Sequence, residues 1–201
     1  MIKAVIFDVG GVLHTNNSNA VDQDIRRTLK LDDEMYNKSY KNCSSALRKG
    51  NINETTFWQE VIQLSGTTEQ LPDESLFLRT FKKTFVINQD VLSLVESLKK
   101  SGYNVSVLSN TIPSHAEFNR KHGLYNGFDQ VVLSTEVGME KPDAEIYIYT
   151  LKALNVKPEE AVFVDDLQEN IEAANIIGMH GLLFTDADKL KKDFIELGVK
   201  F

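Results

Sequence analysis

Near its start the chain reads Lys3-Ala4-Val5-Ile6-Phe7-Asp8-Val9-Gly10-Gly11-Val12-Leu13. The apolar run at residues 4–7 predicts a strand that is covered on both faces of a sheet. Asp8 follows at the carboxyl end of that strand, and Gly10-Gly11 lets the backbone turn sharply and approach a ligand closely. Because open α/β sheets bind ligands at the carboxyl ends of parallel strands, the stretch favours a functional site at Asp8. A solvated Asp before an ordinary turn is the alternative.

From Asn88 onward, amphipathic segments alternate with short apolar runs. A helical pattern from Val91 to Leu98 ends at Gly102, and Pro142 is expected in the first turn of a later helix. Strands that alternate with helices imply right-handed crossovers and a mainly parallel sheet. We therefore predict a doubly wound α/β core, with further strands at residues 103–108, 130–133, 161–164 and 181–184 and further helices at residues 113–122, 171–177 and 186–197.

Residues 15–87 differ from the rest, because helical patterns alternate there with polar stretches and no buried strand is evident. Asn53 is a good N-cap for a helix that carries Phe57 and Trp58. The predicted organisation is a core domain of residues 1–14 and 88–201, interrupted by a helical cap domain of residues 15–87. Its other helices are expected near residues 20–30, 33–48 and 73–85.

The composition is that of an ordinary globular protein and limits its partners. Of the 201 residues, 42% are hydrophobic and 25% are charged, which suits one core with a small insert. The formal net charge of −7 argues against nucleic acid or an anionic membrane as a partner. A phosphate group would then have to be held by a few local cations. The sequence does not distinguish a monomer from a homodimer.

The expected location of the protein is the cytoplasm. Its one cysteine, Cys43, cannot form an intramolecular disulfide and fits a reducing compartment. No segment approaches the roughly 18 apolar residues needed to span a bilayer. Asp8 interrupts the apolar run that follows Lys3, so the start of the chain does not qualify as a signal peptide.

Polar side chains suited to binding phosphate follow several of the predicted strands. Asp8 ends the first strand, Ser109-Asn110 the second and Asp165-Asp166 a later one. Lys141 lies just before a helix N-terminus, where backbone N–H groups attract anions. Taken alone, each has an ordinary explanation, such as a helix cap or a solvated lysine. A parallel sheet, however, brings all of them to one edge.

Repulsion between the carboxylates at such an edge means that a cation has to bind there. Two carboxylates about 4 Å apart repel by roughly 4 kcal/mol at an effective dielectric constant of about 20. Asp8 and the pair Asp165-Asp166 therefore need a cation, and Lys141 supplies one positive charge. Oxygen ligands suit Mg²⁺ better than zinc, and Mg²⁺ offsets charge during phosphoryl transfer. Asp8 is then the candidate nucleophile, which forms an aspartyl-phosphate.

Four motifs carry a resemblance to a known family: Asp8-x-Gly10-Gly11-Val12, Leu108-Ser109-Asn110-Thr111, Gly138-Met139-Glu140-Lys141-Pro142 and Val164-Asp165-Asp166. The chain resembles the haloacid dehalogenase-like (HAD) hydrolases of subfamily I. Two longer stretches are similar to the branch that contains the alpha-glucose-1-phosphate phosphatases and the N-terminal phosphatase domain of soluble epoxide hydrolase: Leu133-Ser134-x-x-Val137-Gly138-Met139-x-Lys141-Pro142 and Asp165-Asp166-x-x-x-Asn170-Ile171-x-x-Ala174. The resemblance is good over residues 1–13 and 88–185, and the helical insert corresponds to the family's C1-type cap.

The resemblance implies a Mg²⁺ site and a set of catalytic residues. Asp8 would be the nucleophile, Lys141 would neutralise it and the phosphoryl group, and Asp165 would orient Lys141. The other implied roles are metal ligation by Asp8, the Gly10 carbonyl and Asp166, with support from Asp165, and hydrogen bonds to the phosphoryl group from Ser109 and the backbone of Asn110.

Gly10 departs from the family pattern. Most phosphatases of this superfamily carry a second Asp there, which protonates the leaving group and later activates water. Losing a general acid–base costs on the order of 10² to 10⁴-fold in rate. Three explanations stay open. In the first, the leaving group is acidic enough to depart with little help, as an anomeric sugar hydroxyl would be. In the second, His14 replaces the missing acid–base group, unless it is only a solvated loop residue. In the third, the protein binds a phosphorylated ligand without turnover.

Two further alternatives concern the reaction and the substrate. Haloacid dehalogenases also lack the second Asp, but they use no metal, and Asp165-Asp166 favours phosphate chemistry. In the insert, Arg48 or Lys49 is a candidate substrate contact, whereas Phe57 and Trp58 are expected in its hydrophobic core. The sequence thus predicts a Mg²⁺-dependent phosphatase for a small phosphomonoester. Sugar phosphates are the favoured substrates, and hexose 1-phosphate comes first among them.

Overall fold

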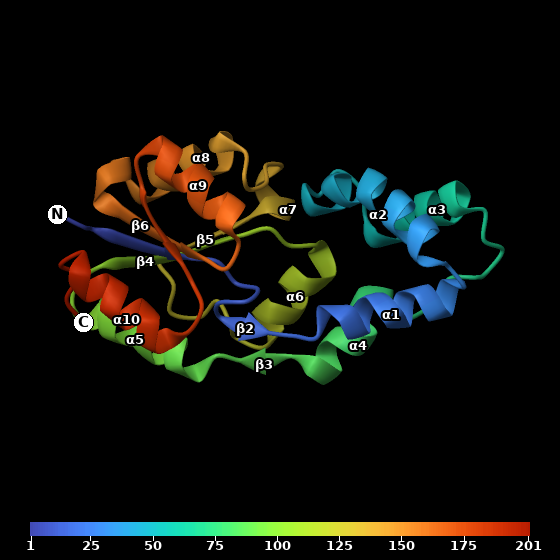
Figure 1. Ribbon diagram of the computed structural model, residues 1–201, viewed down its shortest axis with the longest axis horizontal. Coiled ribbons are helices and arrows are strands. Elements are labelled where there is room, and N and C mark those ends of the chain that lie inside the picture. Colours follow the sequence, from blue (N-terminus) through green and yellow to red (C-terminus); the bar gives the residue numbers. More distant parts are fainter.

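In the computed structural model, which describes residues 1–201, a five-stranded parallel sheet lies between two layers of helices in one half of the molecule (Figure 1). Its strands are β1 (Ala4–Phe7), β4 (Asn104–Ser109), β5 (Gln130–Leu133), β6 (Ala161–Asp165) and β7 (His180–Leu183). The strand order is β5-β4-β1-β6-β7, and every neighbouring pair is parallel. The predicted α/β fold with a parallel sheet is therefore confirmed.

Helices cover both faces of the sheet, which is why its strands have continuous apolar sequences. Side chains alternate along β1, so that Val5 and Phe7 join the hydrophobic cluster on one face, while Ala4 and Ile6 join the cluster on the other. All four are fully buried. The flanking helices are α5 (Gln89–Lys100) and α10 (Ala187–Glu196) on the first face, and α8 (Ala144–Leu154) and α9 (Gln168–Ile177) on the second (Figure 1). Two more helices follow β4 and β5, namely α6 (Pro113–Lys121) and the one-turn α7 (Ser134–Val137).

The helical insert lies to one side of the sheet, between β1 and α5 in the sequence (Figure 1). Phe57 and Trp58 are buried in its hydrophobic cluster, as expected. Each insert helix begins after a polar residue whose side chain accepts a backbone N–H, which satisfies a donor that has no partner within the helix. The helices and their N-caps are α1 (Ser18–Leu29) after Asn17, α2 (Asp33–Arg48) after Asp32, α3 (Glu54–Ser65) after Asn53 and α4 (Leu76–Thr84) after Ser75.

None of the helices combines the length and the apolar character that a membrane crossing requires.

A two-stranded antiparallel ribbon connects the core to the insert, and sequence analysis did not predict it. β2 (His14–Thr15) pairs with β3 (Val86–Ile87), with His14 opposite Ile87. Each strand has only two residues, too few for an alternating pattern to be recognised in the sequence. The ribbon lies at both ends of the segment 15–87, and we propose that the boundary between the core and cap domains falls here.

Pro142 does not occupy the helical position that the sequence suggested. We expected it in the first turn of a helix, but α8 begins at Ala144 and its N-cap is Asp143. The Asp143 N–H instead donates to the Glu140 carbonyl at 3.0 Å, so residues 140–143 form a turn that precedes the helix. Lys141 therefore lies in a turn of its own and not at the first turn of α8.

Aromatic rings pack where the ribbon and α4 meet α6. Phe81 of α4 stacks on His115 of α6 with ring centroids 4.0 Å apart, and Phe85 contacts Phe118 at 5.2 Å. The His14 ring lies 5.5 Å from Phe81 and 4.7 Å from Phe85. We refer to His14, Phe81, Phe85, His115 and Phe118 as the aromatic hinge.

Both histidines of the aromatic hinge have a buried ring nitrogen without a hydrogen-bond partner, although His115 as a whole is only half-buried. His14 Nδ1 and His115 Nε2 have no partner. Burial lowers the pKa of each ring to about 4, because the charged imidazolium is poorly solvated among aromatic side chains. His14 is therefore a neutral hinge residue at pH 7 and not a solvated loop residue.

Acid should weaken the fold through these two histidines. Their folded-state pKa of about 4 lies below the value of 6.5 for a free histidine. Between pH 4 and pH 6.5 the unfolded chain therefore binds more protons than the folded protein. The free energy of unfolding falls as the pH drops through this range. We expect the double variant His14→Phe/His115→Phe to lose less free energy of unfolding over this range than the wild-type protein. Urea denaturation at several pH values measures both losses, and equal losses would contradict the prediction.

Candidate active site

The chain topology brings the predicted site residues to one edge of the sheet. β1 lies between β4 and β6, so the strand ends that carry Asp8, Ser109 and Asp165 are neighbours. The chain first winds from β1 through β4 to β5, then crosses to β6 and β7 on the other side of β1. Ligands of open α/β sheets bind outside the carboxyl ends of the strands, where this winding direction changes.

Lys141 is the centre of the site. Its Nζ donates to Asp8 Oδ1 and to Asp165 Oδ2, both at 2.7 Å, and to the Leu108 carbonyl at 3.1 Å. An ammonium group has three protons, and here each has an acceptor. The Lys141 and Asp165 side chains are only 1% and 0% exposed. The ammonium is therefore fixed in place by the protein before any ligand binds.

Burial and charge have opposing effects on these groups. Burial, with the nearby charge of Asp165, raises the pKa of Asp8 to about 6, although Lys141 acts in the other direction. Burial alone would lower the pKa of Lys141, but the charges of Asp8 and Asp165 outweigh it and raise that pKa above its usual value. Lys141 thus stays protonated at neutral pH.

Two asparagines orient this cluster from opposite sides. Asn110 Nδ2 donates to the Lys141 carbonyl at 2.7 Å, and Asn110 Oδ1 accepts the Lys141 N–H at 2.8 Å. Asp165 Oδ2 accepts from Asn170 Nδ2 at 3.0 Å, and its Oδ1 accepts the Leu167 N–H at 2.8 Å. The sequence predicted only a backbone role for Asn110 and no role for Asn170, because their hydrogen-bond partners lie on other elements.

Asp166 lies at the open side of the cluster, against the turn that follows β1. A Cβ at Gly11 would stand 2.1 Å from Asp166 Oδ2, and Gly11 has a φ of +80°, so the turn and the carboxylate both require a glycine here. One carboxylate oxygen from each of Asp8, Asp165 and Asp166 lies within 4.8 Å of the others.

The acidic cluster fits a hard divalent cation. Three carboxylates against one ammonium leave two negative charges uncompensated, and burial followed by the charge of Asp165 raises the pKa of Asp166. Carboxylate and carbonyl oxygens are the donors that Mg²⁺ prefers. The residues present therefore suit Mg²⁺, as the sequence predicted, and they lack the nitrogen or sulfur donors typical of zinc.

Gly10 and His14 bear on the missing acid–base group. A Cβ at Gly10 would meet no atom within 4 Å, so the position faces open space. The His14 ring packs in the aromatic hinge, and its lowered pKa leaves it without the proton that a general acid needs at pH 7. The structure thus gives no support to His14 as the substitute.

The remaining predicted residues lie in two different places. Ser109 is buried at the end of β4, and its hydroxyl makes only a 3.5 Å contact with the Asn110 carbonyl, so it remains able to bind a ligand. Arg48 Nε donates to Glu140 at 2.7 Å, and the Arg48 guanidinium is thereby engaged by the core. Lys49 forms an ion pair with Asp143 at 3.3 Å. Sequence analysis did not anticipate these core partners.

A family model of haloacid dehalogenase-like hydrolases matches residues 2–178. The chain belongs to this family. A sesquiterpene phosphatase of Aspergillus oryzae is 31% identical to this HAD hydrolase over 92% of the chain and 91% of its own length. A D-ribitol-5-phosphate phosphatase of Bacteroides thetaiotaomicron is 29% identical over 89% of each chain. The family inferred from the four motifs is therefore confirmed.

Solved structures share the fold of this HAD hydrolase. A HAD family enzyme from Bacteroides thetaiotaomicron, in complex with magnesium and inorganic phosphate, superposes with a TM-score of 0.76. It is 23% identical, and the match covers 92% of this chain and 95% of that one. At this identity the likeness establishes the common fold.

Removing the Lys141 charge should destabilise the protein in a pH-dependent way. Lys141→Met leaves Asp8 and Asp165 as buried neighbours without a cation, which typically costs about 3–5 kcal/mol. The loss should be smaller in acid, where one carboxyl takes a proton, than in mildly alkaline buffer. Urea denaturation with a chelator present measures the free energy of unfolding in both buffers.

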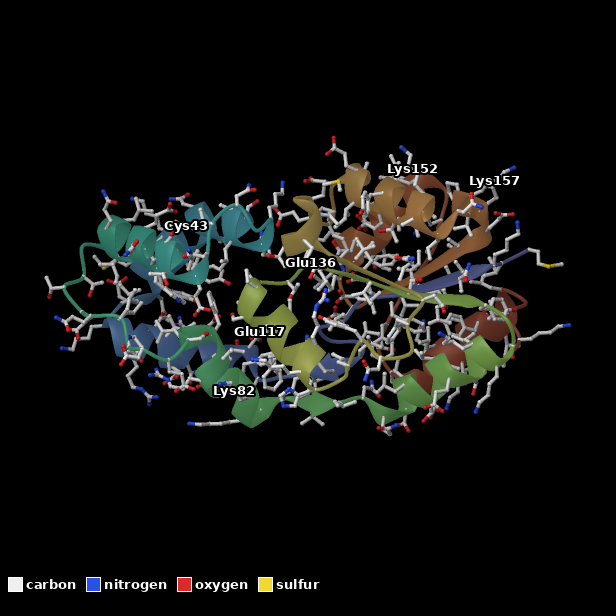
Figure 2. The ribbon with its side chains drawn as sticks, turned by 180° about the vertical axis from the view of Figure 1, so that it is seen from behind. Cys43, Lys82, Glu117, Glu136, Lys152 and Lys157 are labelled. Atoms are coloured by element: carbon white, nitrogen blue, oxygen red, sulfur yellow. The ribbon has the colours of Figure 1, made fainter.

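Lys152→Met is the matched control, because Lys152 is an exposed residue of α8 (Figure 2). It should change the free energy of unfolding little in either buffer. If Lys141→Met were as stable as Lys152→Met throughout, the cluster would not depend on the ammonium.

Proposed function

We propose that this protein is a Mg²⁺-dependent phosphatase that hydrolyses a small phosphomonoester through an aspartyl-phosphate on Asp8. The observation that carries the proposal is the buried Lys141 ammonium between Asp8 and Asp165, at an edge that Asp166 shares. This arrangement offers an oriented carboxylate nucleophile and, beside it, a fixed positive charge that a phosphoryl group would need.

The proposed reaction has two displacements. An Asp8 oxygen attacks phosphorus while the ester P–O bond breaks, and the leaving oxygen takes a proton from water. A second water then attacks the phosphorus of the aspartyl-phosphate, which frees the Asp8 carboxylate and releases inorganic phosphate. The Ser109 hydroxyl and the Asn110 N–H would donate to the phosphoryl oxygens, and the positive charge of Lys141 would stabilise the charge of those oxygens and of Asp8 in both steps.

Mg²⁺ would be held by Asp8, Asp166 and the Gly10 carbonyl, with Asp165 supporting that shell. When bound, it would supply positive charge that offsets the phosphoryl oxygens. The uncompensated charge of the three carboxylates supports this assignment. The magnesium and phosphate in the related HAD enzyme support it as well.

The relatives support the reaction class more than any one substrate. The two relatives described above are phosphatases with different substrates: one is a sesquiterpene phosphatase, and the other is a D-ribitol-5-phosphate phosphatase. We favour a sugar phosphate, and hexose 1-phosphate above all, because Gly10 provides no acid for the leaving group. An anomeric hydroxyl is more acidic than an ordinary alcohol, so it leaves with less help.

A non-catalytic role is the second candidate, and the open space at Gly10 is the observation that favours it. The protein would then bind a phosphorylated ligand and regulate another process without turnover. Haloacid dehalogenation is a weaker alternative, because the acidic pair Asp165-Asp166 suits a metal and a phosphate.

The proposal includes the cytoplasm as the location and a small phosphorylated molecule as the partner. The single cysteine, Cys43, is a buried free thiol in α2, which suits a reducing compartment (Figure 2). The net charge of −7 disfavours nucleic acid and membrane surfaces as partners.

Phosphate release from a panel of sugar phosphates tests the function. We expect release that requires Mg²⁺, that Asp8→Asn abolishes, and that is faster with hexose 1-phosphates than with hexose 6-phosphates. A faster reaction with the 6-phosphates would contradict the leaving-group argument. No release from any ester, including p-nitrophenyl phosphate, together with retained binding of inorganic phosphate, would favour the non-catalytic role.

Gly10→Asp extends this test, because the open space at Gly10 admits a side chain. A general acid contributes on the order of 10² to 10⁴-fold when its leaving group needs a proton. The variant should therefore gain activity on hexose 6-phosphates and change little on p-nitrophenyl phosphate, whose leaving group is acidic.

Gly10 and Gly11 provide a matched pair for the metal site. Gly11→Ala places a Cβ 2.1 Å from Asp166 Oδ2, whereas Gly10→Ala meets no atom within 4 Å. We expect Gly11→Ala to weaken Mg²⁺ binding, measured by calorimetry, by at least about tenfold, the size of effect seen when the groups that orient metal ligands are disturbed. Gly10→Ala should keep wild-type affinity. Equal affinities of the two variants would contradict the assignment of Asp166 as a ligand.

A further inference from the structure

The insert contacts the core at two places that differ in chemistry. On one side, the aromatic hinge joins α4 and the ribbon to α6 through ring contacts, with Phe81 and His14 buried. On the other side, the end of α2 meets α7 and the turn that precedes α8, and these contacts are polar (Figure 1). Opening a polar contact costs little net free energy, because water replaces its hydrogen bonds. Opening an apolar contact costs more, because it exposes apolar surface to water. The α2 side is therefore the contact that can open.

The polar contact converges on one carboxylate, that of Glu140. Its Oε1 accepts from Ser45 Oγ at 2.5 Å, and its Oε2 accepts from Arg48 Nε at 2.7 Å. Lys49 Nζ lies 3.9 Å from Oε1, and the Glu140 side chain is only 13% exposed. One core residue thus binds three residues at the end of a single insert helix.

Two neighbouring contacts fix the register of this docking. Ser134 Oγ donates to the Arg48 carbonyl at 2.7 Å. Gly50 lies so close to Thr135 that a Cβ on it would stand 2.2 Å from the Thr135 carbonyl oxygen. The end of α2 therefore takes one defined position against the core.

Glu140 is also the residue immediately before Lys141. The Lys141 backbone is held by both ends of the Asn110 amide, and its ammonium by Asp8 and Asp165. The carboxylate that binds the insert is thus attached directly to the most rigidly held residue of the active site.

We propose that Glu140 is a positioning residue that holds the insert closed over the active site. By binding Ser45 and Arg48, it sets the end of α2 at a fixed place relative to Lys141. Its loss leaves Lys141 in place, because Asn110, Asp8 and Asp165 still hold that residue, but it frees the insert to move about the aromatic hinge. Binding of the organic part of a substrate, which the insert would cover, then weakens.

Hydrogen–deuterium exchange of the ligand-free protein tests the closure without reference to catalysis. We expect faster exchange at residues 45–52 and 134–143 in Glu140→Ala than in the wild-type protein, with unchanged exchange in β1 and β6. Arg48→Ala removes the same contact from the insert side and serves as a second variant. The double variant should exchange little faster than either single variant, because both substitutions remove one shared interaction.

Kinetics provides the second readout, which rests on the proposed function. Glu140→Ala should raise KM for glucose 1-phosphate by about tenfold, the effect of losing a hydrogen bond to a charged group. The kcat should change much less. Acetyl phosphate, whose organic part is too small to engage the insert, should keep its wild-type kcat/KM. A structural role alone would not separate the two substrates in this way.

Glu136→Ala is the matched control. Glu136 of α7 lines a cleft of about 470 Å³ between residues 50–53 of the insert and α6, but its ion-pair partner, Arg120 of α6, belongs to the core and not to the insert (Figure 2). It should leave exchange and KM unchanged. Glu140→Ala results that match this control in both readouts would overturn the proposal. Faster exchange in a protein without any turnover would support the closure and refute the proposed function.

Discussion

The arrangement of the whole site depends on one interaction, the buried ammonium of Lys141 between the carboxylates of Asp8 and Asp165. Without it, two acids at the ends of adjacent strands would repel each other in an environment that solvates neither. The contact requires β1 next to β6, so that Asp8 and Asp165 are neighbours, and it requires the Lys141 turn to reach over both. Asn110 and Asn170 complete it by orienting the lysine backbone and the second carboxylate.

The same interaction explains why the site suits a phosphate and a cation together. One ammonium does not neutralise Asp8, Asp165 and Asp166, so the cluster suits a divalent cation, and under the proposed function that cation would allow a phosphate to bind beside it. Gly11 permits the Asp166 carboxylate to approach, and Gly10 leaves space beside it. Under the proposed function, Asp8 would form an aspartyl-phosphate here, and the substrate would have to provide an easily released leaving group.

Much of this architecture is predictable from the sequence because its causes are local or topological. The buried run at residues 4–7 and the strand–helix alternation indicate a parallel sheet, and a parallel sheet alone is enough to gather Asp8, Ser109 and Asp165 at one edge. The side-chain partners could not be predicted in this way, because they join residues that are far apart in the chain. Examples are the hydrogen bond from the Asn110 amide to the Lys141 carbonyl and those from Ser45 and Arg48 to the Glu140 carboxylate. The ribbon escaped prediction because its strands are two residues long, and Pro142 was misplaced because the turn at residues 140–143 interrupts the approach to α8.

The proposed mechanism is tested most directly by detection of a phosphoryl group on Asp8 itself. The protein would be mixed with Mg²⁺ and glucose 1-phosphate, quenched in acid within the first turnover, digested and analysed by mass spectrometry. We expect a phosphoryl group on the peptide that contains Asp8, and its absence from the Asp8→Asn protein. Release of phosphate that persists in Asp8→Asn, or that proceeds with no modified Asp8 peptide at any time, would contradict the proposed mechanism.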